Sequence, residues 1–232
     1  MRTREGAAGE LRAVLFDLDG TLLDSLEDLA DSMNAVLRRF GFPVHPVGAY
    51  RRFVGDGMEV LVRRTVPERA RDAETLRRAL DEMRAEYGGR HAEKTRPYRG
   101  IPELLGELAR RRVPFAILSN KPDDATKLVV REVLGTWSFR AVLGARPGRP
   151  KKPDPTAALE IAAALGIPAG QWIYLGDTDT DMLTAEAAGM VAVGALWGFR
   201  DAGELTSAGA RGLLRDPLEL LRWLEPHPPG SS

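Results

Sequence analysis

The sequence contains no cysteine in its 232 residues, and this absence excludes whole classes of chemistry. Disulfide bonds, thiolate nucleophiles and cysteine-ligated zinc all require the missing side chain. No apolar run approaches the roughly 18 residues that a membrane-spanning helix needs. The charged, Gly/Ala-rich start, Met1 to Glu10, also carries no apolar signal segment. We therefore expect a cytoplasmic protein with no membrane partner.

The sequence also lacks a net charge, because 33 basic side chains balance 33 acidic ones. A neutral chain has no overall field to attract nucleic acid, so we expect no nucleic-acid partner. Its length suffices to bury a core, and one or two domains are both compatible with it. The Pro/Gly/Ser-rich end, residues 226–232, predicts a disordered tail. The composition does not distinguish a monomer from a homodimer.

One stretch joins a short apolar run to an acidic turn, and the other motifs follow it. Residues 14–16 read Val-Leu-Phe, which is typical of a buried strand, and Asp17, Asp19, Gly20 and Thr21 come directly after. Two carboxylates two positions apart share a side while the chain stays extended, so their repulsion favours a cation or a shared proton between them. Gly20 lets the backbone approach an anion, and the Thr21 hydroxyl can bond a phosphate oxygen or the loop itself. The alternative for this stretch alone is a solvated acidic turn.

Residues 24–94 predict only helices. Apolar residues recur at helical spacing over 26–37, 50–54, 58–66 and 68–87, and Gly88-Gly89 is expected to end the last helix. Ser25 and Asp28 have the spacing of a capping box at the first helix.

Strand and helix patterns alternate after residue 95. Strands are predicted at 113–118, 141–143, 172–175 and 191–193, and helices at 101–112, 125–134, 155–165 and 182–188. Such alternation over short loops predicts a parallel sheet, to which the first strand must also belong. Ligands bind outside the carboxyl ends of the strands in such sheets, and Asp17 and Asp19 lie at such an end.

Three later motifs follow predicted strands or begin predicted helices. Ser119-Asn120-Lys121 could hold a phosphate, with a helix cap as the alternative. Lys152 has a stiff platform in Lys-Pro-Asp-Pro for pairing with an anion, with a solvated lysine as the alternative. Asp177 and Asp181 offer the oxygen ligands that Mg²⁺ prefers, and an acidic turn with Asp179 as helix cap is the alternative.

In this order, the motifs resemble those of the haloacid dehalogenase (HAD) superfamily. Residues 17–25 match its first motif, D-x-D-G-T-L-x-D-S, at every fixed position, and the similarity runs from about Leu11 to Leu224. The resemblance implies an α/β fold, with a Rossmann-like parallel sheet core flanked by helices at residues 1–23 plus 95–232. It also implies an inserted all-helical cap of the C1 type at residues 24–94.

The same resemblance implies a role for each motif residue. It makes Asp17 the nucleophile and Asp19 the general acid/base. The implied phosphate-binding residues are Thr21, Ser119, Asn120 and Lys152; the implied Mg²⁺ ligands are Asp17, Asp19 through its backbone carbonyl, and Asp177, with Asp181 in the second shell of the metal.

Within the superfamily, the sequence looks most like phosphoglycolate phosphatases, through residues 17–25, 53–57, 119–122 and 151–155. This implies Mg²⁺-dependent hydrolysis of a small phosphorylated metabolite, first of all 2-phosphoglycolate, with Gly55, Asp56 and Gly57 as substrate contacts from the cap. One departure is Arg99, where such proteins usually carry proline at the cap hinge.

Other activities remain open at this stage. The same motifs serve pyrophosphatases, nucleotidases and sugar-phosphate phosphatases. A β-phosphoglucomutase-like phosphotransferase is disfavoured by Thr21, where such relatives usually carry valine. A catalytically silent binding protein is disfavoured because no motif residue is missing.

Overall fold

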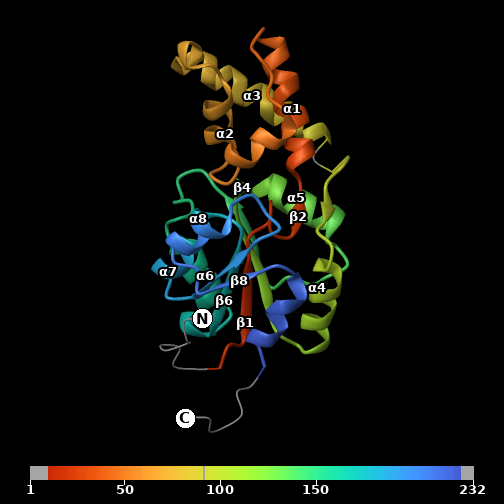
Figure 1. Cartoon of the computed structure of the whole chain (residues 1–232), viewed down its shortest axis with the longest axis vertical. Coiled ribbons are helices and arrows are strands. Elements are labelled where there is room, and N and C mark those ends of the chain that lie inside the picture. Colours follow the sequence, from red (N-terminus) through yellow and green to blue (C-terminus); the bar gives the residue numbers. More distant parts are fainter. Residues whose placement is uncertain (1–9, 91, 226–232) are drawn as a thin grey trace.

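The computed structural model describes residues 10–90 and 92–225, and its centre is a six-stranded sheet with the order β5-β4-β1-β6-β7-β8 (Figure 1). The strands are β1 (Ala13–Phe16), β4 (Phe115–Pro122), β5 (Val142–Ala145), β6 (Trp172–Gly176), β7 (Val191–Ala195) and β8 (Gly212–Leu214). Each neighbouring pair is parallel. The predicted α/β fold with a parallel sheet is confirmed.

The side chains of β1 alternate between two hydrophobic clusters, one on each face of the sheet. Val14 and Phe16 belong to one cluster, and Ala13 and Leu15 to the other, as the two-residue period of a strand requires. The first face is covered by α4 (Ile101–Arg110), α5 (Asp123–Val133) and the 3₁₀ helix η4 (Pro217–Trp223). The second is covered by α6 (Thr156–Ala164), α7 (Asp179–Ala187) and α8 (Ala202–Ser207), with the short η3 (Ala169–Gln171) leading into β6.

A group of helices, called the cap below, stands beyond the end of the sheet (Figure 1). It comprises α1 (Leu26–Arg39), η1 (Val47–Arg52), α2 (Met58–Thr65), η2 (Glu68–Ala70) and α3 (Ala73–Arg90). These helices share a hydrophobic cluster of their own. The chain enters and leaves the cap through a two-stranded antiparallel pair, β2 (Leu23–Asp24) and β3 (Arg96–Pro97). The exact boundary between cap and core stays a prediction.

Several element boundaries differ from the predicted ones. Strand β4 continues four residues beyond Leu118, because the chain resumes pairing with β5 at Pro122 after an irregularity. Residues 119–121 therefore lie within a strand and not in a loop. The glycine pair Gly88-Gly89 does not end α3, which runs to Arg90. The short strands β2, β3 and β8 were not predicted, because two or three residues show no periodicity.

The predicted capping box at Ser25 and Asp28 is wrong. Ser25 precedes α1 but makes no side-chain cap, and its hydroxyl donates to Asp19 at 2.6 Å. Asp28 is 1% exposed and accepts hydrogen bonds from the backbone N–H groups of Lys94 and Thr95 and from the Thr95 hydroxyl. The carboxylate thus joins the first cap helix to the segment that returns to the core.

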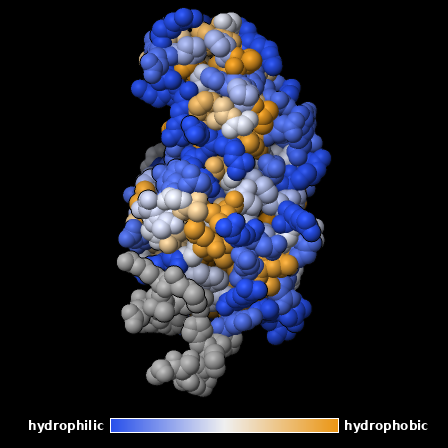
Figure 2. Space-filling model, in the orientation of Figure 1, coloured by the Kyte–Doolittle hydropathy of each residue, from blue (hydrophilic) through white to orange (hydrophobic). Residues whose placement is uncertain are grey.

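The surface in Figure 2 is mostly hydrophilic, and its apolar side chains form small separate areas. The exposed large apolar residues belong to different elements; they are Val44, Val47, Leu159, Leu183 and Leu218. Within residues 10–90 and 92–225, no helix combines the length and apolarity that a membrane span requires. The predicted tail, residues 226–232, lies outside the described residues.

Replacing Asp28 should destabilise the protein strongly. Asp28→Ala leaves the two buried donors of Thr95 and the partly buried N–H of Lys94 without their acceptor, and we expect a loss of about 3 kcal/mol in the free energy of unfolding. Chemical denaturation measures it. The control is Asp31→Ala, which breaks a partly exposed ion pair with Lys94 and should cost less than about 1 kcal/mol. Equal losses in the two variants would contradict the role given to Asp28.

Candidate active site

The carboxyl ends of three adjacent strands bring the motif residues together. In the order β4-β1-β6, strand β4 carries Ser119, β1 is followed by Asp17, and β6 is followed by Asp177. Parallel strands place their carboxyl ends at one edge of the sheet, so residues more than 100 positions apart meet there. The cap faces the same edge (Figure 1).

Three buried carboxylates form a cluster at this edge. Asp17, Asp177 and Asp181 each place an oxygen within 4.8 Å of the others, and their exposures are 6%, 0% and 0%. Like charges at this separation repel strongly away from water. Carboxylate oxygens are also the ligands that Mg²⁺ prefers. The donor set therefore fits a divalent cation.

Burial and the repulsion of neighbouring carboxylates raise the pKa of two of these acids, Asp17 and Asp177. Burial comes first for Asp17, the charge of Asp181 adds to it, and the pKa rises from 3.8 to about 7 even though Lys152 acts to lower it. Burial, followed by the charges of Asp17 and Asp181, raises the pKa of Asp177 well above its ordinary value. A bound cation would stabilise the ionised form of these carboxylates, which burial and repulsion disfavour.

Lys152 balances part of this charge. Its ammonium lies 2.7 Å from Asp17 and 2.6 Å from Asp181, and the residue is 7% exposed. Burial alone would lower the pKa of Lys152, but the two carboxylates outweigh burial and raise it well above its ordinary value. The predicted pairing of Lys152 with an anion thus exists within the protein itself.

The side chain of Asn120 holds Lys152 in place. Its oxygen accepts from the Lys152 N–H at 3.0 Å, and its amide donates to the Lys152 carbonyl at 3.1 Å and to the Gly55 carbonyl at 3.3 Å. Both polar ends of Asn120 are thereby engaged. The side chain positions Lys152 and the cap loop, so a phosphate contact predicted for Asn120 is left to its backbone.

The Thr21 hydroxyl binds within the acidic cluster, and the phosphate contact predicted for Thr21 stays a prediction. Its side chain is fully buried, and its hydroxyl donates to Asp177 at 2.8 Å. The second oxygen of Asp177 accepts from the Phe199 N–H at 2.8 Å. Thr21 therefore takes the other option that its hydroxyl had, a bond within the protein, and fixes the orientation of an acid.

Asp179 does not cap helix α7. The cap is Thr178, which forms a reciprocal capping box with Asp181. Asp181 uses one oxygen for this box and the other for Lys152. These bonds fix the orientation of the Asp181 carboxylate, and its place in the second shell of a metal stays a prediction.

Asp19 pairs with Lys121, which the sequence analysis named as the third residue of a motif but gave no role of its own. The Lys121 ammonium lies 2.9 Å from both oxygens of Asp19, and it also donates to the Tyr87 hydroxyl of the cap at 2.7 Å. Lys121 is 6% exposed. Its place directly after Ser119-Asn120 was the available signal. Nothing local marks Tyr87, because its partner lies 34 positions away.

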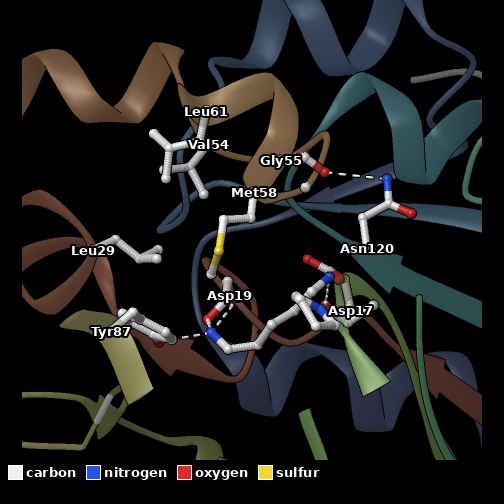
Figure 3. A pocket seen from close by; sticks show the side chains of 13 residues that line it. Asp17, Asp19, Leu29, Val54, Gly55, Met58, Leu61, Tyr87 and Asn120 are labelled. Carbon is white, nitrogen blue, oxygen red and sulfur yellow. Dashed lines mark hydrogen bonds and ion pairs between the residues drawn. The ribbon is translucent and has the colours of Figure 1, made fainter. Parts of the chain in front are cut away.

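Asp17, Asp19, Lys121 and Tyr87 line a pocket between cap and core (Figure 3). Its core wall carries Asp17, Asp19, Ser119 and Lys121. Its cap wall is largely apolar; it is formed by Leu29, Val54, Met58, Leu61 and Tyr87. Ser119 is buried, and its hydroxyl accepts from the Lys121 N–H at 3.3 Å.

The cap loop expected to touch substrate lies at this pocket but only in part. Gly55 and Gly57 line it, with φ angles of 121° and 90° that favour glycine. Asp56 points elsewhere, since it accepts from the Thr180 hydroxyl at 2.8 Å and pairs with Arg64 at 2.6 Å. Its carboxylate therefore joins the cap to α7.

Comparison with known proteins decides the family. The sequence profile of the haloacid dehalogenase-like hydrolases matches residues 14–195, which span the whole site. The chain belongs to this family. It is 34% identical over 197 residues to a phosphoglycolate phosphatase of Pseudomonas savastanoi pv. phaseolicola, an alignment that covers 83% of this chain and 72% of that protein. It is 32% identical over 189 residues to a phosphoglycolate phosphatase of Xanthomonas campestris pv. campestris, covering 82% and 85%.

Solved structures agree with this haloacid dehalogenase-like fold. A protein of Lactobacillus delbrueckii subsp. bulgaricus, provisionally named a phosphoglycolate phosphatase, superposes with a TM-score of 0.86 and 29% identity over 93% of this chain and 99% of that one. A haloacid dehalogenase-like family hydrolase of Streptococcus pneumoniae reaches 0.83 at 23% identity, over 93% and 99%, and supports the fold alone.

Without metal, the stability of this hydrolase should fall as the pH rises. Folded Asp17 keeps its proton up to about pH 7, whereas the unfolded residue loses it near 3.8. The folded state therefore binds more protons in this window, and a rising pH favours unfolding. We expect the melting temperature in EDTA to drop between pH 5 and pH 8.

Asp17→Asn is the matched control for this pH dependence, because the amide has no charge to bury. It should flatten the curve, and Mg²⁺ added to the parent protein at pH 8 should raise the melting temperature. A metal-free melting temperature that rises from pH 5 to pH 8, equally in both proteins, would contradict this account.

Proposed function

We propose that the protein is a Mg²⁺-dependent phosphatase that hydrolyses 2-phosphoglycolate, or a closely similar acidic phosphomonoester, through an aspartyl-phosphate on Asp17. The observation that carries the proposal is the buried set of Asp17, Lys152 and Asp177 beneath a pocket that also holds Asp19. The named activity of the curated relatives supports the substrate. Residues 24–94 act as the cap, and residues 1–23 plus 95–232 form the catalytic core.

Asp17, Asp177 and the backbone carbonyl of Asp19 would hold the metal, with Asp181 in its second shell. Bound there, Mg²⁺ neutralises negative charge on the phosphate and on Asp17. The fit of the buried donor set supports this assignment. Thr21 and the Phe199 N–H keep the Asp177 carboxylate in one orientation, because each donates to a different oxygen.

Asp17 attacks phosphorus through a carboxylate oxygen, and the bond from phosphorus to the leaving alkoxide breaks. Asp19 gives its proton to that alkoxide and later takes one from the water that attacks the aspartyl-phosphate. The water oxygen leaves as part of inorganic phosphate, and Asp17 is regenerated. Lys152 and Ser119 stabilise the phosphoryl oxygens during both steps.

Lys121 supports an acidic substrate. Among the charged residues that line the pocket in the described chain, Asp17 and Asp19 are negative and Lys121 is positive. Lys152 lies deeper and balances Asp17 and Asp181. A carboxylate on the substrate therefore has Lys121 as its partner, since the facing cap wall offers mainly apolar side chains. The ammonium moves from Asp19 to the incoming carboxylate as substrate binds.

Replacing the nucleophile should abolish activity and leave the fold intact. Asp17→Asn keeps the size of the side chain but cannot form the phosphoryl-enzyme, so we expect at most a trace of phosphate release from 2-phosphoglycolate with Mg²⁺. EDTA should silence the parent protein, and Mg²⁺ should restore it. The control is Asp179→Asn, a neighbouring acid outside the cluster, which should stay within about twofold of the parent. An active Asp17→Asn enzyme would rule out the covalent route.

Lys121 should determine the preference for an acidic substrate. The measured quantity is the ratio of kcat/KM for 2-phosphoglycolate to kcat/KM for ethyl phosphate, which has the same chain length without the carboxylate. Lys121→Met should lower this ratio roughly 10- to 100-fold, the worth of a buried charged hydrogen bond. Effects on Asp19 are common to both substrates and cancel in the ratio.

Lys127→Met is the matched control, because Lys127 forms an exposed ion pair with Asp123. It should leave the ratio unchanged. If Lys121→Met lowers both rate constants equally, Lys121 serves Asp19 alone and the substrate anion has another partner. If the parent enzyme prefers ethyl phosphate, the substrate proposed here is wrong while the phosphatase chemistry stands.

A further inference from the structure

The loop that follows β7 touches both the acidic cluster and the cap. Residues 197–200, called the junction loop below, read Trp-Gly-Phe-Arg. They carry none of the motif residues described above. The cap and the cluster are joined through this short segment in ways that the roles assigned so far leave unexplained.

On the core side, the junction loop fixes Asp177. The Phe199 N–H donates to one oxygen of Asp177 at 2.8 Å. The Trp197 indole donates at 2.9 Å to the carbonyl of Thr21, whose hydroxyl holds the other oxygen at 2.8 Å. Gly198 packs so closely that a Cβ there would lie 2.3 Å from the Asp177 Cβ. Both oxygens of this acid are therefore oriented by the loop, one directly and one through Thr21.

On the cap side, both the side chains and the backbone of the junction loop contact the cap. Phe199 is 7% exposed and belongs to the hydrophobic cluster of the cap helices. The Arg200 guanidinium donates to the carbonyls of Arg51 and of Val54, the latter at 3.0 Å. Arg51 donates in return to the carbonyl of Gly198. Cap and loop thus hold each other through reciprocal bonds.

We propose that the junction loop makes the affinity of the acidic cluster for its divalent cation depend on the seating of the cap, with Arg200 and Phe199 as positioning residues. The inference rests on the proposed use of Mg²⁺ by this site. The Phe199 N–H donates to Asp177, and the Phe199 ring packs in the cap. A movement of the cap away from the core would therefore displace the residue that orients Asp177. Linkage then requires the converse, that a bound cation favours the seated cap.

The test is a Mg²⁺ titration of the metal-free protein by calorimetry, without substrate. Arg200→Gln removes the guanidinium that donates to the cap carbonyls, and it changes no residue of the acidic cluster. We expect it to raise the dissociation constant for Mg²⁺ roughly 5- to 20-fold, within the usual range of coupling between sites. The kcat at saturating Mg²⁺ should change far less than the Mg²⁺ concentration needed to reach it. Arg200→Lys, which retains a donor, should recover part of the affinity.

Two variants serve as controls. Glu204→Gln removes the ion pair that Glu204 makes with Arg200 at 3.0 Å and leaves the bonds to the cap. Glu59→Gln breaks a different contact between cap and core, the 2.7 Å pair with Lys151. Both should bind Mg²⁺ as the parent does. If Arg200→Gln fails to fold, Arg51→Gln tests the reciprocal bond to Gly198 in its place.

The outcomes separate the inference from the proposed function. Unchanged Mg²⁺ affinity in Arg200→Gln overturns the inference and leaves the phosphatase intact. Equal loss in Arg200→Gln and Glu59→Gln also overturns it, because any contact with the cap would then act as well as this loop. A parent protein that binds no Mg²⁺ overturns both the metal dependence and the inference.

Discussion

Three carboxylates share one buried corner at the ends of β1 and β6, and the site depends on how their repulsion is balanced. Lys152 contacts two of them, Asp17 and Asp181, and leaves the corner with a negative excess that suits a divalent cation. A lysine buried between acids works only if its backbone is fixed. Asn120 fixes this backbone by accepting from the Lys152 N–H and donating to the Lys152 carbonyl. The same side-chain amide also donates to the Gly55 carbonyl of the cap loop. Charge balance and cap position therefore share one side chain.

A second pair, Asp19 with Lys121, is kept apart from this corner. Burial acts to lower the pKa of Lys121, but the Asp19 carboxylate and the Tyr87 hydroxyl outweigh it and raise that pKa. Burial likewise raises the pKa of Tyr87 to about 12, so its hydroxyl stays neutral. Each acid proposed for catalysis thus pairs with a different ammonium group, Asp17 with Lys152 and Asp19 with Lys121. Lys121 lies in β4, and Lys152 lies in the loop before α6. In the proposed mechanism, this separation would let Asp17 bind phosphorus while Asp19 transfers protons.

The alternation of strands and helices predicted the sheet, because apolar strands that end in polar residues leave few other arrangements. The resemblance to the haloacid dehalogenase superfamily predicted that Asp17, Lys152 and Asp177 share one site. The sequence analysis failed where a polar side chain chooses between neighbours in space. Thr21 and Asn120 could each have served a phosphate, and tertiary packing directs them to Asp177 and Lys152 instead. Asp28 has the spacing of a helix cap, yet its partners lie 66 and 67 positions away. Tyr87 and the junction loop had no local signal for the same reason.

The paired strands β2 and β3 have a consequence for how such an enzyme changes its substrate. The chain passes from core to cap and back at adjacent residues, with Leu23 opposite Pro97 and Asp24 opposite Arg96. The two chain connections between the helical segment and the core therefore lie side by side, and the segment could be exchanged whole without breaking the sheet. A grafted segment would have to bring three things with it: a carbonyl for Asn120, a hydroxyl for Lys121 and an apolar seat for Phe199. Together with the bond of Asp56 to Thr180 and the bonds between Arg51 and the junction loop, these contacts define the interface to which new specificities must conform.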